Sequence, residues 1–173
     1  MFDRELRDLA FSRLVSPSGS TASVPWPPAV SCEIVEPPPR LIIFGTNSVG
    51  LAIARTAENL EFRCLLIEND TDETALENLR IDVNTYIAVT HPRTFLRAIE
   101  FCLARPHAYL GVVGSREKIE DLRRNLAARG ISPDLSRRMH GPIGFDIGAR
   151  TPEEIAIAAL AQILAAKNGT LGE

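Results

Sequence analysis

Two glycine turns carry the residues of this sequence that are best suited to hold an anion. The first, LIIFGTNSVG, runs from Leu41 to Gly50 and is typical of an apolar strand, a tight turn and a helix start. It matches the phosphate-binding pattern G-x-G-x-x-G at Gly45 and Gly50, but Asn47 replaces the middle glycine. That glycine lets the backbone approach a pyrophosphate, so the Asn47 side chain is expected to crowd the ligand. The turn keeps its two architectural glycines and lacks the one that meets the ligand.

The second turn, Gly114 to Lys118 (GSREK), follows the apolar run Tyr109–Val113 and opens another helix. A helix N-terminus attracts anions through its unpaired backbone N–H groups and the positive end of the helix dipole. Ser115 adds a hydroxyl group there, and Arg116 and Lys118 add positive charge. The alternative is that Ser115 simply caps the helix while both basic side chains face solvent.

An acidic residue, Glu68, ends the predicted strand Phe62–Ile67 and lies 18 residues after Gly50. Dinucleotide-binding folds place a carboxylate here to accept hydrogen bonds from the adenosine ribose, and its charge favours NAD over NADP. The alternative is an acid that merely begins a turn. Together with the first glycine turn it gives a candidate cofactor site made of Gly45, Thr46, Asn47, Ser48, Gly50 and Glu68.

Both turns need a parallel sheet to position them, and the apolar pattern predicts one. Predicted strands alternate with predicted helices along the chain. The strands are Leu41–Phe44, Phe62–Ile67, Thr85–Val89 and Tyr109–Val113, and the helices between them are Val49–Leu60, a short Thr74–Leu79 and Arg93–Ala104. This pattern predicts an α/β, Rossmann-like, doubly wound sheet with strand order 3-2-1-4-5 and helices on both faces. In that order Leu41–Phe44 lies beside Tyr109–Val113, so the two glycine turns would share one crevice.

The C-terminal part of the chain changes character at residues 139–150, which are too rich in glycine for a long regular element. We expect a short edge strand and a tight loop there. Thr151-Pro152-Glu153-Glu154 then combines an N-cap residue, a proline at the first helical position and a glutamate at the third. These residues predict a helix that continues to about Lys167.

Proline content divides the chain into three predicted parts. Residues 1–15 have the spacing of a short amphipathic helix, which docks on its own domain or on a second copy of the chain. Residues 16–39 hold seven of the twelve prolines and form a Pro/Ser-rich linker. Residues 40–173 form the Rossmann-like domain.

Composition excludes several classes of function. A net charge of −3, from 19 basic and 22 acidic residues, argues against nucleic-acid binding. The sequence contains no apolar run near 18 residues and starts with charged residues, which predicts a cytoplasmic protein that does not enter membranes. Three cysteines at irregular spacing indicate reduced thiols rather than a metal site or disulfides. The three histidines, His91, His107 and His140, form no recognisable catalytic set with a nucleophile.

Two segments, GVVGSREK and HGPIGFDIGARTPEEIA, resemble the C-terminal Rossmann domain of the XdhC/CoxI family, from about Val35 to about Gly169. These are accessory proteins of xanthine dehydrogenase and related molybdenum hydroxylases. The resemblance implies a protein that binds the molybdopterin cofactor, helps it acquire its terminal sulfur and delivers it to the apo-enzyme. It also implies that Gly114, Ser115, Arg116, Lys118 and Asp146 contribute to cofactor binding.

The chain departs from this family in two places. The family usually reads GAGHV at the first turn, where this chain has the residues from Gly45 to Val49, without the middle glycine and the histidine. Residues 1–34 are also too few and too rich in proline for the N-terminal domain that usually precedes this one.

We therefore expect a binding protein, rather than an enzyme, that recognises a phosphate-bearing cofactor and a partner protein. The cofactor is of the molybdopterin type or NAD, and the partner is a molybdenum hydroxylase apo-enzyme. One alternative is an NAD-dependent oxidoreductase, which would need a larger substrate-binding domain. The other is a remnant Rossmann domain that serves only protein contacts.

Overall fold

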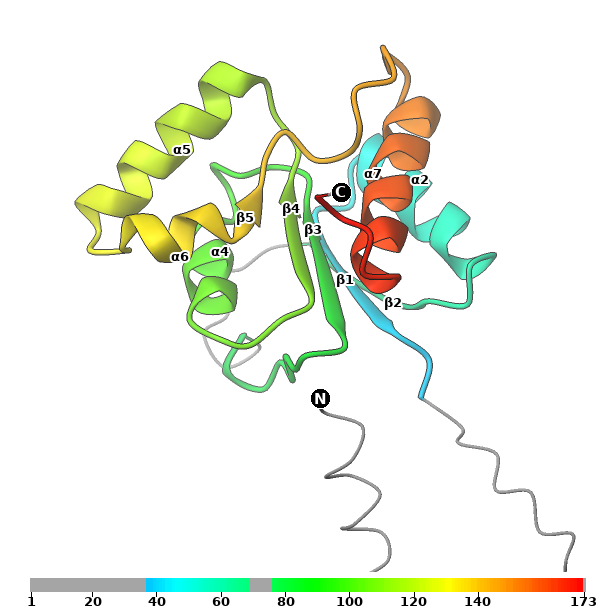
Figure 1. The fold of residues 1–173 in the computed structure, drawn as a ribbon, viewed down its shortest axis with the longest axis horizontal. Helices are drawn as coiled ribbons and strands as arrows, with labels where there is room; N and C mark the ends of the chain where they lie inside the picture. The colour runs from blue at the N-terminus through cyan, green and yellow to red at the C-terminus, as the bar shows by residue number, and fades with distance from the viewer. Residues whose placement is uncertain (1–36, 69–75, 173) are drawn as a thin grey trace, which may run out of the picture. The chain divides into compact units, whose positions relative to one another are not determined.

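A five-stranded sheet with helices on both faces forms the core of the protein (Figure 1). The computed structural model describes residues 37–68 and 76–172, within a unit that begins at Pro37. The predicted N-terminal helix and nearly all of the predicted linker lie outside the described residues. The elements are β1 (Arg40–Phe44), α2 (Ser48–Glu58), β2 (Arg63–Ile67), β3 (Thr85–Val89), α4 (Leu96–Leu103), β4 (Tyr109–Val112), α5 (Arg116–Ala128), α6 (Pro133–Arg137), β5 (Met139–His140) and α7 (Pro152–Lys167).

All four strand pairs are parallel, which confirms the predicted fold class, but the predicted strand order is wrong. The order is β2-β1-β3-β4-β5, so β3 lies between β1 and β4. Burial explains the difference. All five residues of β3 are buried, which requires a central position, whereas β2 is partly exposed and occupies an edge. The strand order therefore reverses between β1 and β3, as in flavodoxin-like sheets.

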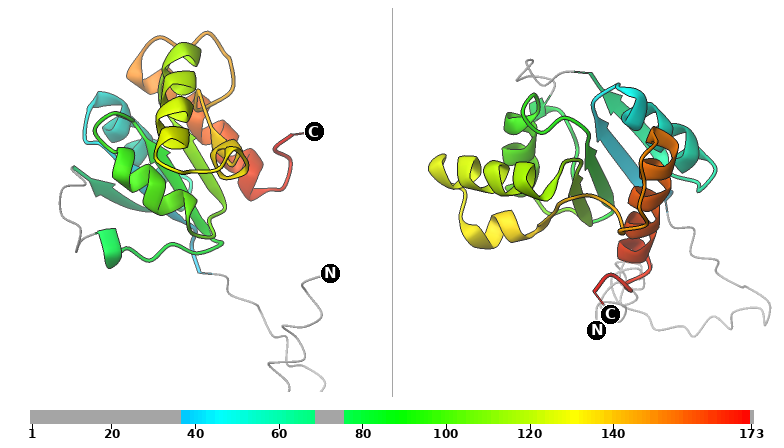
Figure 2. Two further views of the ribbon diagram at one scale, coloured as in Figure 1. Left: turned by 90° about the vertical axis from the view of Figure 1, so that its left-hand side faces the viewer. Right: turned by 90° about the horizontal axis from the view of Figure 1, so that it is seen from above.

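Helices α4 and α5 lie on one face of the sheet, and α2 and α7 lie on the other (Figure 2). On one face, side chains such as Ile42 and Phe44 of β1 pack against buried residues of α4 and α5. On the other, Leu41 and Ile43 pack against α2 and α7. The side chains of β1 alternate between the two clusters because successive residues of a strand point to opposite faces. The short predicted edge strand after residue 138 is β5, whose two residues pair with β4.

Candidate functional site

The first glycine turn packs too tightly for any side chain at its two glycines. Gly45 has a φ of +113°, and a Cβ atom there would lie 2.1 Å from Oγ1 of Thr90. A Cβ atom at Gly50 would lie 2.0 Å from the carbonyl oxygen of Gly45. The Thr90 hydroxyl donates a hydrogen bond to the carbonyl oxygen of Phe44 at 3.1 Å, which ties β3 to the end of β1. The two glycines therefore have the architectural roles predicted from the sequence.

Asn47 fills the position where the predicted pyrophosphate would approach the helix. It is the N-cap of α2, and its Oδ1 accepts a hydrogen bond from the backbone N–H of Gly50 at 2.9 Å. One of the N–H groups that an anion could use is thus already satisfied. Thr46 and Ser48 are exposed on either side of Asn47. Exposed Glu68 lies beside this turn, because the residue before it, Ile67, accepts a hydrogen bond from the N–H of Gly45 at 2.8 Å.

The two glycine turns do not share the predicted crevice. Gly45 follows β1 and Gly114 follows β4, and β3 lies between these strands. Both turns are at the carboxyl edge of the sheet, but the segment after β3, which begins with Thr90, separates them. A shared crevice would require β1 and β4 to be neighbours, and β3 lies between them.

The second glycine turn is capped like the first. Ser115 is the N-cap of α5, and its Oγ accepts a hydrogen bond from the N–H of Lys118 at 3.3 Å. This is the capping role that the sequence left open as an alternative. The basic residues of the turn are directed to different places, because Lys118 lines one cavity and Arg116 lines another. Gly114 and the preceding Val113 border both cavities.

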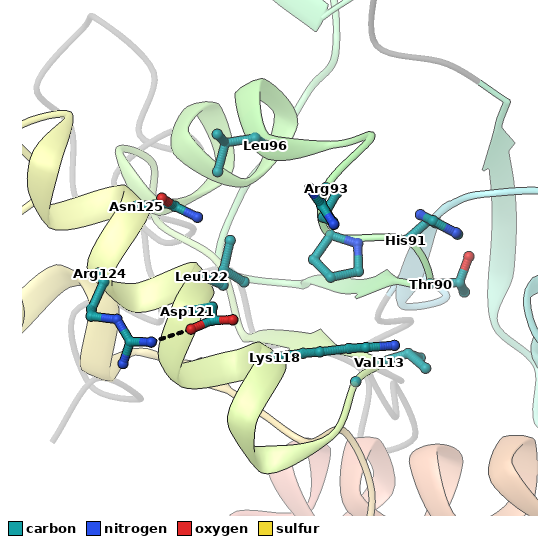
Figure 3. Close-up of a pocket in the computed structure, with 12 residues that line it drawn as sticks. Thr90, His91, Arg93, Leu96, Val113, Lys118, Asp121, Leu122, Arg124 and Asn125 are labelled. Atoms are coloured by element: carbon teal, nitrogen blue, oxygen red, sulfur yellow. Dashed lines mark hydrogen bonds and ion pairs between the residues drawn. The ribbon is translucent and has the colours of Figure 1, made fainter.

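The first of these, which we call the basic cavity, lies between the segment after β3 and helix α5 and has a volume of about 690 Å³. Figure 3 shows the basic side chains Arg93, Lys118 and Arg124 around it. Arg124 forms an ion pair with Asp121 of the same helix, so these two charges largely offset each other. Arg93 and Lys118 have no ion-pair partner among the described residues. Two positive charges therefore remain available to an anion in this cavity.

Sequence reasoning missed the contribution of the segment after β3 to this cavity. Thr90, His91 and Arg93 all line it, together with Lys118 from the predicted site. Their place follows from the central position of β3 beside β4, because the ends of neighbouring parallel strands meet at one edge. The only signal in the sequence is the unbroken TYIAV run of β3, which is compatible with a central strand.

The second cavity, which we call the apolar cavity, lies between the second glycine turn, the 141–150 loop and α7, with a volume of about 630 Å³. Most of its lining is apolar and includes Phe145 and Ile147, whose exposed fractions are 46% and 56%. Its polar lining side chains are Ser115, Arg116 and Asp146. The two segments that carry the family resemblance thus meet around this cavity.

Hydrogen bonds to neighbouring elements hold the 141–150 loop in place. The N–H of Ile143 donates to the carbonyl oxygen of Val112 in β4 at 2.8 Å. The N–H of Gly144 donates to Oε1 of Gln162 in α7 at 2.8 Å, and the Tyr109 hydroxyl donates to the same oxygen at 2.5 Å. Gln162 therefore connects β4, the loop and α7. Because burial raises the pKa of Tyr109, its hydroxyl stays protonated and remains a donor.

The start of α7 has the cap that the sequence predicts. Thr151 is the N-cap, and its Oγ1 accepts a hydrogen bond from the N–H of Glu154 at 3.2 Å. The Glu154 carboxylate accepts hydrogen bonds from the N–H groups of Thr151 and Arg150, at 3.0 and 2.7 Å, and these bonds lower its pKa. This capping box fixes the end of the loop that borders the apolar cavity.

The described cysteines and His140 lie in environments typical of side chains with a structural role. Cys64 and Cys102 are free thiols, as predicted, and burial raises the pKa of both, that of Cys102 to about 12. Cys32 lies outside the described residues. His140 stacks on Tyr109 with ring centroids 4.8 Å apart. Over the part of the chain that is described, no three His, Cys, Asp or Glu residues gather into a potential metal site, and none of the helices could cross a membrane.

Comparison with known proteins shows which family the sequence matches. Residues 41–163 match the family model described as the XdhC Rossmann domain. Over 78% of its length the chain is 31% identical to the uncharacterized protein YqeB of Escherichia coli, and over 75% it is 25% identical to a probable xanthine dehydrogenase subunit of Bacillus subtilis. It covers 28% and 43% of these two proteins, so it spans less than half the length of either relative.

A similar fold occurs in a crystal structure described as a xanthine dehydrogenase from Bacillus halodurans. The TM-score is 0.64 at 24% sequence identity, and the match covers 77% of this chain and 44% of that one. At this level of identity, the likeness concerns the fold.

Proposed function

The chain belongs to the XdhC Rossmann-domain family, and from this premise we propose that it is an accessory protein that binds a phosphate-bearing cofactor at its second glycine turn. A molybdenum hydroxylase apo-enzyme is the proposed partner, as the name of the Bacillus subtilis relative suggests. The cofactor is of the molybdopterin type. The basic cavity would hold its phosphate group, and the neighbouring turn would position the rest of the ligand.

The observation that carries this proposal is a pair of basic side chains at the carboxyl edge of the sheet, Arg93 and Lys118, which have no ion-pair partner among residues 37–68 and 76–172. They come from two elements, the segment after β3 and helix α5, so the fold brings the charges together. Ligands of open α/β sheets bind at this edge. The charge and the location both suit a phosphate group. The cofactor, when bound, supplies the metal-binding dithiolene chemistry, while this chain supplies the anion contacts.

NAD remains the alternative ligand, and it would use the first glycine turn. Glu68 lies beside that turn, as dinucleotide binding requires. However, the N–H of Gly50 already donates a hydrogen bond to the Asn47 side chain. In addition, no residue of the first glycine turn lines either of the two cavities. We therefore place the phosphate-bearing ligand at the second turn.

Isothermal titration calorimetry with molybdopterin, NAD and inorganic pyrophosphate tests this proposal. We expect molybdopterin and pyrophosphate to bind the unaltered protein. The double substitution Arg93→Ala and Lys118→Ala should weaken both by about a hundredfold or more, because each charge-assisted hydrogen bond contributes about 1.5–3 kcal/mol. The melting temperature of the free protein should hardly change, because neither side chain has an ion-pair partner within the described part of the chain.

Arg137→Ala is the matched control, since Arg137 is an exposed basic residue on α6 that pairs with Asp134 and borders neither cavity. It should leave binding unchanged. Molybdopterin binding that survives the double substitution would contradict the site. The absence of binding to the unaltered protein would contradict the function, and tight NAD binding would favour the alternative.

A further inference from the structure

The composition of the apolar cavity differs from that of the basic cavity beside it. Phe145, Ile147 and other apolar side chains form most of its lining, and three polar side chains are set among them. Sites for organic ligands commonly combine an apolar lining with a few polar groups that fix orientation. With a volume of about 630 Å³, this cavity is large enough for a bicyclic ring. The opposite charges of Arg116 and Asp146 offset each other in this lining, so the cavity suits a flat, uncharged group rather than a phosphate.

The two cavities meet at the second glycine turn, because Val113 and Gly114 border both. A ligand that places an anionic group in the basic cavity can therefore extend over this turn into the apolar cavity. Building on the proposed function, we infer that one ligand occupies both cavities, with its phosphate beside Arg93 and Lys118 and a planar heterocycle beside Phe145 and Asp146.

Of the described residues that line the apolar cavity, Asp146 alone is acidic. Its Oδ1 accepts one weak hydrogen bond, from the N–H of Gly148 at 3.4 Å, and among the described residues its other oxygen has no partner. An ionised carboxylate only accepts hydrogen bonds, and its two oxygens match a pair of adjacent N–H donors. The 2-amino-6-oxo edge of guanine and the equivalent 2-amino-4-oxo edge of pterins each offer such a pair, a ring N–H and an amino N–H. Asp146 thus selects rings that carry this edge.

Phe145 provides the second contact that a planar ring requires. The Phe145 side chain is 46% exposed although it borders the cavity, so its ring is accessible to a ligand. Its backbone is fixed, since its N–H donates to the carbonyl oxygen of Ala158 in α7 at 3.3 Å. Stacking on an aromatic side chain tolerates different rings, because every planar ring has a π-face. Phe145 therefore contributes affinity, and Asp146 contributes selectivity.

Calorimetry with four probes separates the two cavities. The probes are inorganic pyrophosphate, guanosine diphosphate, inosine diphosphate and 6-hydroxymethyl-7,8-dihydropterin diphosphate. All four carry a diphosphate group, and inosine lacks the 2-amino group of guanine. We expect the guanine and dihydropterin probes to bind about tenfold to a hundredfold more tightly than the inosine probe, because inosine lacks the hydrogen bond from the 2-amino group to the Asp146 carboxylate. The stronger binder of the two identifies the source of the ring.

Two substitutions test the residues. Asp146→Asn should remove the preference for guanine over inosine and leave pyrophosphate affinity unchanged, and Phe145→Ala should weaken every ring-bearing probe about tenfold but not pyrophosphate. Asp134→Asn and Ile157→Ala are the matched controls, because both residues are exposed and neither lines the basic cavity or the apolar cavity. Pyrophosphate binding without any gain from the ring, or an unaltered guanine preference in Asp146→Asn, would overturn this inference and leave the proposed function standing. Failure of all four probes to bind would overturn both.

Discussion

Substitution of Gln162 tests whether one side chain holds the 141–150 loop against the sheet. Its Oε1 is the shared acceptor for the Tyr109 hydroxyl, at 2.5 Å, and the Gly144 N–H, at 2.8 Å. Gln162→Leu keeps a side chain of similar size and removes the acceptor, so two donors lose their partner. Tyr109 is 1% exposed, and water therefore cannot readily replace the bond to its hydroxyl.

The cost follows from the two unsatisfied donors. The buried Tyr109 hydroxyl without a partner costs about 1–3 kcal/mol, and the N–H of the half-buried Gly144 costs less because water can reach it. The added apolar surface of leucine returns part of this, which leaves a net loss of about 1–3 kcal/mol. In a chain of this length the melting temperature should fall by about 2–12 °C. Urea denaturation followed by circular dichroism measures the free energy of unfolding, and differential scanning calorimetry gives the melting temperature.

Tyr109→Phe provides the control. It removes one donor and leaves the bond between Gly144 and Gln162 intact, so it should cost only about 1 kcal/mol. The double substitution Tyr109→Phe and Gln162→Leu should cost less than the sum of the two single substitutions, because the hydroxyl that Gln162→Leu would strand is already gone. A loss below about 1 kcal/mol for Gln162→Leu, or strict additivity in the double variant, would refute the reasoning.

Two further predictions concern backbone geometry and pH. Gly45→Ala should destabilise the protein clearly more than Gly130→Ala. Both glycines have a positive φ, so the backbone strain of an alanine is common to the two variants. A Cβ atom at Gly45 would lie 2.1 Å from Oγ1 of Thr90, whereas a Cβ atom at Gly130 would meet nothing within 4 Å. Equal melting temperatures for the two variants would show that the contact with Thr90 relaxes at no cost. Burial, and then the charge of Arg123, lowers the pKa of His140 from its ordinary value of 6.5. Below pH 6.5 the unfolded chain therefore binds more protons than the folded chain. The free energy of unfolding should fall as the pH decreases. Urea midpoints at about pH 7.5 and about pH 5.5 should differ less in His140→Gln than in the unaltered protein, and an unchanged difference would exclude this histidine as a cause.

Local chemistry explains which elements the sequence predicts well. The cap of α7 depends on residues three apart in the chain, Thr151 and Glu154, and the structure has the predicted capping box. The strand β3 coincides with the predicted Thr85–Val89, because an apolar run bounded by polar residues is visible without knowledge of its neighbours. The α/β fold class follows from the same local alternation of elements.

Strand order and the basic cavity depend on contacts between distant residues, which local patterns do not contain. The sequence of β2 is nearly as apolar as that of a central strand, yet β2 lies at an edge and Leu65 is 43% exposed. Nothing in its residue types distinguishes it from β3. The position of Arg93 beside the second glycine turn follows from that order and could not be predicted without it. Likewise, the contact between Tyr109 and Gln162 joins residues 53 positions apart.

The fixed position of the 141–150 loop has a consequence for the kinetics of binding. Three backbone N–H groups of this loop, those of Ile143, Gly144 and Phe145, are already bonded to β4 and α7. A loop held in this way has little freedom to lose when a ligand arrives, so the ordering cost of binding is small. Association with the apolar cavity should then be a single step, whose observed rate rises linearly with ligand concentration and reaches no plateau set by loop closure. The dissociation rate, rather than a conformational change, would then determine how long a ligand stays bound.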